Sequence, residues 1–163
     1  APEYTMKRML DDYVARFYSK LAVRAARLEK SDFAEAREIA AWKREVADHW
    51  NEFEVESFDY QDDAAHPTVG EEYDIRIVID RKGLKSMLGV EIVYTKENPE
   101  NHQTELVTVA PFMLKKEVGS KLYFELRKKA AVYGHMRVGF RVYPVNPKLP
   151  HRMDFAYVRW IQP

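Results

Sequence analysis

The chain has 163 residues, of which 46% are hydrophobic and 32% are charged, and its 26 lysines and arginines balance 26 aspartates and glutamates. This composition is typical of a globular protein with a substantial core, and no apolar run approaches the roughly 18 residues of a membrane span. Because basic and acidic residues are balanced, the sequence has no basic stripe that would bind a phosphate backbone. We therefore expect neither nucleic acid nor a membrane as a partner.

Cysteine is absent, which excludes disulfides, thiolate nucleophiles and cysteine-based zinc sites and is compatible with a reducing compartment. The first residues have neither the charged nor the apolar region of a signal peptide. We therefore expect a cytoplasmic protein, and the leading Ala1-Pro2 suggests an excised fragment or an expression scar.

The first predicted element is a long amphipathic helix from Thr5 to about Lys30, with Thr5 as its N-cap. Its apolar residues recur at steps of three and four, the spacing of one helix face: Met6, Leu10, Tyr13, Val14, Phe17, Leu21 and Leu28.

A second helix is predicted after a break at Ser31-Asp32, where Asp32 and Glu35 have the spacing of a capping box. Helical spacing continues through Ile39, Trp42, Val46 and Trp50. Because the break is only about two residues long, we expect an antiparallel or sharply angled helical hairpin over residues 1–51.

After Asn51 the apolar period changes from that of a helix to two, the period of a half-buried strand. Eight segments show it: Phe53–Tyr60, Tyr73–Asp80, Val90–Tyr94, Glu105–Val109, Phe112–Val118, Leu122–Leu126, Met136–Val142 and Phe155–Ile161. With no helical pattern between them, they predict an antiparallel β-sandwich over residues 52–163, and hence an α+β fold.

Three connections stand out in the strand region. Gly119-Ser120 predicts a two-residue hairpin, and Asn98-Pro99-Glu100-Asn101 predicts a longer turn. The polar stretch Gln61–Gly70 is either a long loop or an arm connecting strands.

A search for catalytic chemistry yields no catalytic, cofactor-binding or metal-binding residue. The six glycines are scattered rather than gathered in a phosphate-binding turn, and the serines lie outside any nucleophile elbow. Single histidines and adjacent carboxylates are expected on solvated surfaces. They are His49, His66, His102, His135 and His151, with the pairs Asp11-Asp12, Asp62-Asp63 and Glu71-Glu72.

Aromatic residues make up 13% of the chain and have two possible uses. Exposed Trp and Tyr side chains can stack on sugar rings, but in a sandwich without disulfides they more often fill the core. We expect mainly core or inter-unit packing for Trp42, Trp50 and Trp160, while five tyrosines are open to either role: Tyr60, Tyr94, Tyr133, Tyr143 and Tyr157. The candidate sugar contacts are Tyr143, Tyr157 and Trp160.

Several stretches, in order along the chain, resemble bacterial and archaeal α-glucan phosphorylases. The segment Phe140–Trp160 is similar to the family's closing pattern, R-V-x-P-x-H-P-x-L-P followed by V-R-W, although Asn146 replaces the usual His. Four further stretches agree with family patterns: Pro2–Tyr18, Ala40–Lys43, Asp74–Tyr94 and Tyr133–Phe140.

The resemblance implies a parent glycosyltransferase that uses pyridoxal phosphate to phosphorolyse α-1,4-glucans to glucose 1-phosphate. In the family the cofactor lysine lies upstream of the first helix, so no catalytic or cofactor residue is carried over and no cofactor is expected in this segment. The first helix resembles the last helix of the catalytic body, and the sandwich resembles the appendage after it.

The expected role is therefore structural, with the catalytic body as partner. Residues 5–28 are predicted to mediate self-association of the isolated chain, because their apolar face needs a cover. Two alternatives stay open at this point: a glucan-binding module and an unrelated protein-interaction domain.

Overall fold

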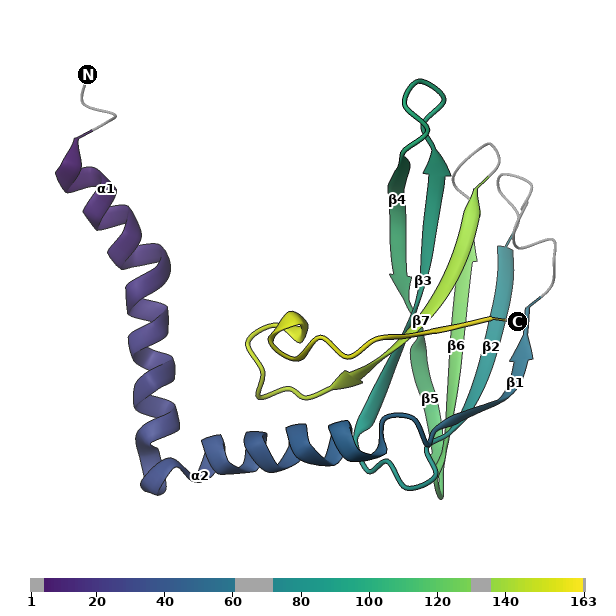
Figure 1. Ribbon diagram of the computed structural model, residues 1–163, viewed down its shortest axis with the longest axis horizontal. Helices are drawn as coiled ribbons and strands as arrows, with labels where there is room; N and C mark the ends of the chain where they lie inside the picture. The colour runs from purple at the N-terminus through teal and green to yellow at the C-terminus, as the bar shows by residue number, and fades with distance from the viewer. Residues whose placement is uncertain (1–4, 61–71, 130–135, 163) are drawn as a thin grey trace. The chain divides into compact units, whose positions relative to one another are not determined.

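The computed structural model describes residues 5–60, 72–129 and 136–162 (Figure 1). Within these ranges helices come first and eight strands in two antiparallel sheets follow, which confirms the predicted fold class. The chain divides into two compact units, Ala1–Arg44 and Glu45–Pro163. The predicted loop or arm Gln61–Gly70 lies outside the described residues.

The helical unit contains α1 (Met6–Tyr13), the short π-helix η2 (Val14–Tyr18) and most of α2 (Ser19–His49). The Thr5 hydroxyl accepts a hydrogen bond from the Arg8 backbone N–H at 3.4 Å, so the predicted N-cap is confirmed. At the end of η2 the Ser19 hydroxyl donates to the Val14 carbonyl at 2.7 Å, five residues back along the chain.

Helix α2 consists of two helical segments, because Lys30, Ser31, Asp32 and Phe33 have non-helical backbone angles. The predicted break is confirmed, but the predicted capping box is wrong. Asp32 has φ 55° rather than the extended conformation of an N-cap, and its carboxylate pairs with Arg37 at 3.2 Å. The Glu35 carboxylate pairs with Arg27 at 3.1 Å instead of reaching back to the cap.

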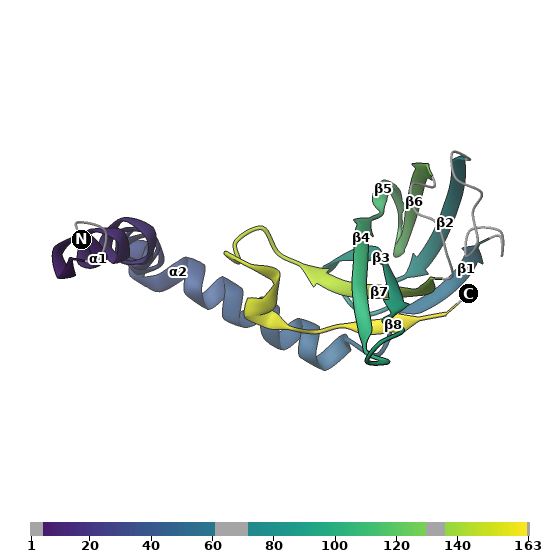
Figure 2. The ribbon, with the colours of Figure 1, turned by 90° about the horizontal axis from the view of Figure 1, so that it is seen from above.

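The second unit is a sandwich of two four-stranded sheets, with the orders β1-β2-β6-β5 and β4-β3-β7-β8 (Figure 2). The strands are β1 (Glu54–Asp59), β2 (Glu72–Asp80), β3 (Met87–Glu97), β4 (Thr104–Pro111), β5 (Met113–Val118), β6 (Lys121–Lys129), β7 (Arg137–Val145) and β8 (Arg159–Ile161). The last strand was predicted to span Phe155–Ile161, but β8 contains only Arg159–Ile161. Arg152–Phe155 forms the 3₁₀-helix η4, with the His151 ring accepting from the Met153 N–H at 3.1 Å.

The core lies between the two sheets, and alternating residues of β2, β6 and β7 are buried in it. Phe140 of β7 is 2% exposed and lies at the centre of an aromatic cluster. Its ring centroid is 4.7 Å from Phe58, 5.2 Å from Tyr60 and 6.3 Å from Phe112. The fully buried aliphatic side chains of the sandwich include Ile75, Ile77, Ile79, Leu84, Val90, Ile92, Leu122 and Val142.

Both predicted turns are confirmed. Gly119 has φ +61° in the turn between Val118 and Lys121, which pair with each other across the β5–β6 hairpin. In the turn after β3, the Asn98 side-chain oxygen accepts from the Glu100 N–H at 2.9 Å and the Asn101 side-chain oxygen accepts from the Gln103 N–H at 2.9 Å.

The last turn of α2 belongs to the sandwich unit and is anchored in it. Trp50 is 6% exposed and packs edge-on against Phe53 and Tyr157, with centroid distances of 5.3 and 5.6 Å. The backbone N–H of Lys85 donates to the Glu45 carboxylate at 2.6 Å. The prediction that Trp50 packs in the core is therefore confirmed.

Candidate functional site

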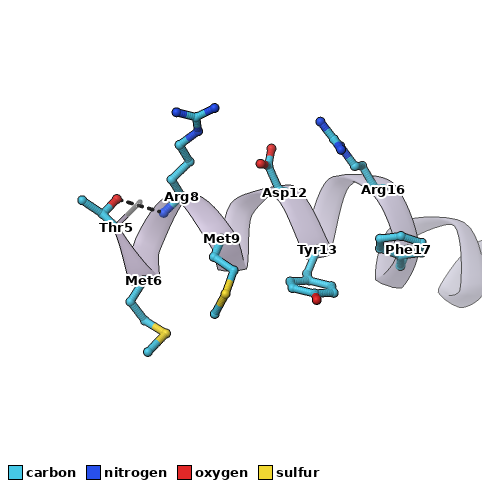
Figure 3. Close-up of a pocket in the computed structure, with 8 residues that line it drawn as sticks. All are labelled: Thr5, Met6, Arg8, Met9, Asp12, Tyr13, Arg16 and Phe17. Atoms are coloured by element: carbon cyan, nitrogen blue, oxygen red, sulfur yellow. Dashed lines mark hydrogen bonds between the residues drawn. The ribbon is translucent and has the colours of Figure 1, made fainter. Parts of the chain in front are cut away.

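The apolar face of the first helix is the most extended exposed feature of the helical unit. Met6, Met9 and Tyr13 project from one side of the helix, whereas Arg8, Asp12 and Arg16 project from the other (Figure 3). Together with Thr5 and Phe17 they line a shallow pocket. The rings of Tyr13 and Phe17 lie 5.7 Å apart. The described residues of α1 and η2 include no buried side chain.

This exposure continues along the helical unit. The large apolar side chains that it leaves exposed are Met6, Met9, Leu10, Tyr13, Val14, Phe17, Tyr18, Leu21, Val23 and Phe33. Contiguous exposed apolar side chains of this kind mark an interaction surface, because an amphipathic helix requires a cover for its apolar face. We call those from Met6 to Leu21 the helix face.

A second notable feature is a buried carboxylate on the outer face of the second sheet. Glu91 of β3 is 3% exposed, although alternation points it away from the core residues Val90 and Ile92. Arg141 of β7 donates through Nε to one of its oxygens, and Arg152 of η4 donates to the other at 2.7 Å. A buried charge is stable only when paired in this way, so the cluster fastens η4 to the sheet.

Tyr143 of β7 is held within this cluster. The Arg152 guanidinium lies 5.1 Å from its ring centroid. The ring also covers Gly89, its partner across the sheet, so closely that a Cβ atom there would lie 2.6 Å from it. Burial raises the pKa of the Tyr143 hydroxyl. Its ring is thus bracketed by a guanidinium and the backbone of Gly89.

Tyr157 lies in the connection between η4 and β8. Its ring contacts Phe155 at a centroid distance of 4.6 Å and Trp50 at 5.6 Å. Tyr143 and Tyr157 line one small pocket together with Glu91, Arg141 and Arg152. The structure thus brings together two of the three candidate sugar contacts.

Trp160 is separate from that pocket. It lies on β8, at the end of the strand order of the second sheet, and is 57% exposed, whereas the sequence favoured core or inter-unit packing. A Cβ atom on Gly139 would lie 2.8 Å from Cζ3 of the indole, and the Arg141 guanidinium lies 5.7 Å from the ring. Trp160 therefore rests on the sheet and presents much of its surface to solvent.

The remaining aromatic predictions have mixed outcomes. Trp42 is half-buried in the helical unit. Tyr94 is buried and its hydroxyl lies 2.5 Å from that of Tyr73, while Tyr60 packs on Phe140. Tyr133 lies outside the described residues.

The histidines that the structure describes have local roles. His49 pairs with Glu52 at 2.7 Å, and this hydrogen bond raises the pKa of the His49 ring, while His102 lies 3.0 Å from Glu97. Over residues 5–60, 72–129 and 136–162, no group of three or more His, Asp and Glu side chains could hold a metal ion. The predicted surface residues His66, Asp62, Asp63, Glu71 and His135 lie outside these ranges.

Sequence reasoning missed the Glu91 cluster. Its members come from a strand, a second strand and a 3₁₀-helix, 50 and 61 residues apart in sequence, so no local motif joins them. The one available signal is a charged residue in the centre of the apolar run Leu88–Tyr94.

No helix in the described part of the chain is both long enough and apolar enough to cross a bilayer.

Comparison with known proteins identifies the family. Residues 50–162 match the family model described as the glycogen phosphorylase C-terminal domain. Over 165 aligned positions the chain is 28% identical to maltodextrin phosphorylase from Thermococcus litoralis, with 98% of the chain aligned, and it spans only 19% of that relative's length. The chain belongs to the glycogen phosphorylase C-terminal domain family, in agreement with the resemblance of its motifs.

Proposed function

We propose that this chain is the structural C-terminal region of an α-glucan phosphorylase and is inactive alone. Residues 1–51 form the last helices of the catalytic body, and residues 52–163 form the appended domain that braces it. The parent enzyme acts in the cytoplasm, where it uses pyridoxal phosphate to phosphorolyse α-1,4-glucan to glucose 1-phosphate. Family membership sets aside the alternative of an unrelated interaction domain.

The observation that carries this proposal is the uncovered helix face. Its side chains, from Met6 to Leu21, have the spacing and chemistry of a helix that packs into a larger core. Met and aromatic residues are also those enriched in the buried centres of protein interfaces. A catalytic body preceding this segment supplies a cover that the helical unit by itself lacks.

The junction between α2 and the sandwich supports a bracing role. Val46 and Trp50 are buried, Glu45 accepts from the Lys85 N–H, and Arg159 donates to the Phe53 carbonyl at 2.9 Å. These contacts fix the last turn of α2 to the sandwich.

The decisive test is made in the parent enzyme. Phe17→Ala on the helix face should lower its thermal inactivation midpoint, since removing a buried Phe typically costs about 3–5 kcal/mol. The matched control is Arg16→Ala, on the opposite side of the same turns, which should have an effect within about 0.5 kcal/mol. Equal midpoints for the two variants would show that the helix face is not covered by the catalytic body.

Activity provides a second test. The isolated 163-residue chain, incubated with glycogen, phosphate and pyridoxal phosphate, should release no glucose 1-phosphate. Release above a protein-free control would contradict the structural assignment.

Self-association of the isolated chain provides a third test. Without the catalytic body, residues 5–28 should pair with a second copy, giving a larger mass by light scattering as concentration rises. The double variant Leu10→Asp/Phe17→Asp should be monomeric, whereas Met113→Asp, at a similarly exposed apolar position on β5, should associate like the unaltered chain. A strictly monomeric unaltered chain at high concentration would refute this prediction.

A further inference from the structure

We propose that Trp160 and Arg141 form a glucan-binding subsite on the outer face of the second sheet, with Glu91 as a positioning residue. The ligand class rests on the proposed function, since the parent enzyme would act on an α-1,4-glucan. This subsite contains one of the three candidate sugar contacts from the sequence and adds two residues that the sequence did not indicate.

Trp160 supplies the apolar surface of the subsite. Because Gly139 has no side chain, the indole can lie against the β7 backbone, where a Cβ atom would be 2.8 Å from Cζ3. The remaining indole surface faces solvent, as the 57% exposure requires. An aromatic ring held by a sheet loses little conformational entropy on binding, so it suits stacking against the C–H face of a pyranose ring.

Arg141 supplies hydrogen-bond donors beside the ring. It is the direct partner of Trp160 in the β7–β8 pairing, and its guanidinium lies 5.7 Å from the indole. Glu91 accepts from Nε, while the two terminal amino groups of Arg141 have no hydrogen-bond partner among the described residues. These amino groups can donate to sugar hydroxyls at the edge of a ring stacked on Trp160.

Glu91 holds this arrangement in place before any ligand arrives. Its carboxylate is 3% exposed and is shared between Arg141 and Arg152, so the guanidinium of Arg141 cannot turn away without leaving a buried charge half-paired. A donor fixed in advance binds more tightly than one that must be ordered on binding.

The two tyrosine candidates are less suitable as stacking surfaces. Tyr143 lies between the Arg152 guanidinium and Gly89, and Tyr157 contacts both Trp50 and Phe155. A ligand could stack on either ring only by displacing these contacts. One exposed ring with a guanidinium beside it also fits a ligand with one apolar face and a rim of hydroxyls better than it fits a broad protein surface.

Affinity electrophoresis of the 163-residue chain in gels with and without glycogen tests this proposal. Glycogen should retard the unaltered chain, and Trp160→Ala should weaken binding at least about tenfold, as expected when a central aromatic contact is lost. Arg141→Met, which keeps much of the side-chain length but no donors, should weaken binding by a smaller factor. Isothermal titration with maltoheptaose should give the same ranking.

The matched control is Tyr123→Ala, which removes a half-buried aromatic on the first sheet with Lys116 4.2 Å from its ring. This variant should bind glycogen like the unaltered chain. Thermal melting should show that every variant is folded, and Trp160→Phe should recover part of the retardation if stacking is responsible.

Three results would overturn the proposal. They are no retardation of the unaltered chain, equal retardation of Trp160→Ala in a parent enzyme of unchanged stability, and equal retardation of Trp160→Ala together with a destabilised parent enzyme. The last result would make Trp160 a contact with the catalytic body. The scaffolding proposal is judged separately, by Phe17→Ala against Arg16→Ala in the parent, so either proposal can fail without the other.

Discussion

The helical unit and the sandwich both have clear apolar patterns, but only in the sandwich do the apolar side chains pack against one another in a buried core. Phe140 of the sandwich is 2% exposed inside an aromatic cluster, whereas Phe17 of η2 is 55% exposed. Both residues lie on the apolar side of their elements. The comparison teaches that amphipathicity predicts which face of an element is to be buried, but not whether the same chain provides the partner.

The two units also differ in how they can be tested. Substitutions in the sandwich should change the stability of the isolated chain, because their contacts are internal. Substitutions on the helix face should change it little and should act only where a partner is present. Four predictions follow this contrast from the largest expected effect to the smallest.

Phe140→Ala should have the largest effect on the isolated chain. It removes a ring packed against Phe58, Tyr60 and Phe112, so the free energy of unfolding should fall by about 3–5 kcal/mol. Phe17→Ala is the matched control in the helical unit and should change it by no more than about 0.5 kcal/mol. Urea denaturation at low protein concentration measures the free energy of unfolding of both variants. Similar losses would show that the two units do not differ in how their apolar side chains are buried.

Glu91→Gln should have an intermediate effect. The amide keeps the shape of the side chain but cannot balance two guanidinium groups, so a loss of about 1–3 kcal/mol is expected. The comparison variant is Asp74→Asn, which removes a more exposed pairing with Arg127 at 2.8 Å and should lose less than about 1 kcal/mol. If both variants lose the same free energy of unfolding in denaturant melts, the burial of Glu91 does not make its ion pairs more stabilising than the exposed pair of Asp74.

Gly119→Ala should lower the stability of the sandwich by about 1 kcal/mol. The cause is the backbone angle of φ +61°, since a Cβ atom there would meet no other atom within 4 Å. Gly119→Asn, whose side chain tolerates this left-handed backbone region, is the control and should have a smaller effect. A tolerated Gly119→Ala would mean that the hairpin can adopt another turn type.

Asp80 should give the sandwich a stability that depends on acid pH. The hydrogen bond from the Lys82 backbone N–H, aided by Ser120, lowers the pKa of the Asp80 carboxyl to about 2. Because this value is below the usual one of about 3.9, ionised Asp80 stabilises the fold above about pH 4, and that stability is lost as pH falls towards 2. Asp80→Asn should flatten the fall of the thermal midpoint over this range, and an unchanged slope would contradict the assignment.

Local signals predicted local structure well. Thr5 is an N-cap, the helix breaks at Ser31-Asp32, and Gly119-Ser120 forms a two-residue hairpin, because each depends on neighbouring backbone groups. The capping box failed because Asp32 adopts φ 55°, which a sequence spacing does not specify. The last strand was predicted too long because the alternation through Phe155 continues into a 3₁₀-helix.

The candidate site was predictable only in part. Trp160 was named from its residue type, but its exposure depends on the contact with Gly139, which lies on another strand. Arg141, Glu91 and Arg152 come together through the pairing of β3 with β7 and the position of η4. Strand alternation gives the face of a residue but not its neighbours across the sheet.

The sequence by itself determined the order of helices and strands, the apolar face of each and the family resemblance, because these depend on residue spacing along one chain. Only the tertiary structure decided which faces are covered. It closed the sandwich around Phe140, left Phe17 uncovered and gathered two arginines around Glu91. The physical reason is that burial and charge pairing depend on distances in space, which join residues 50 or more positions apart.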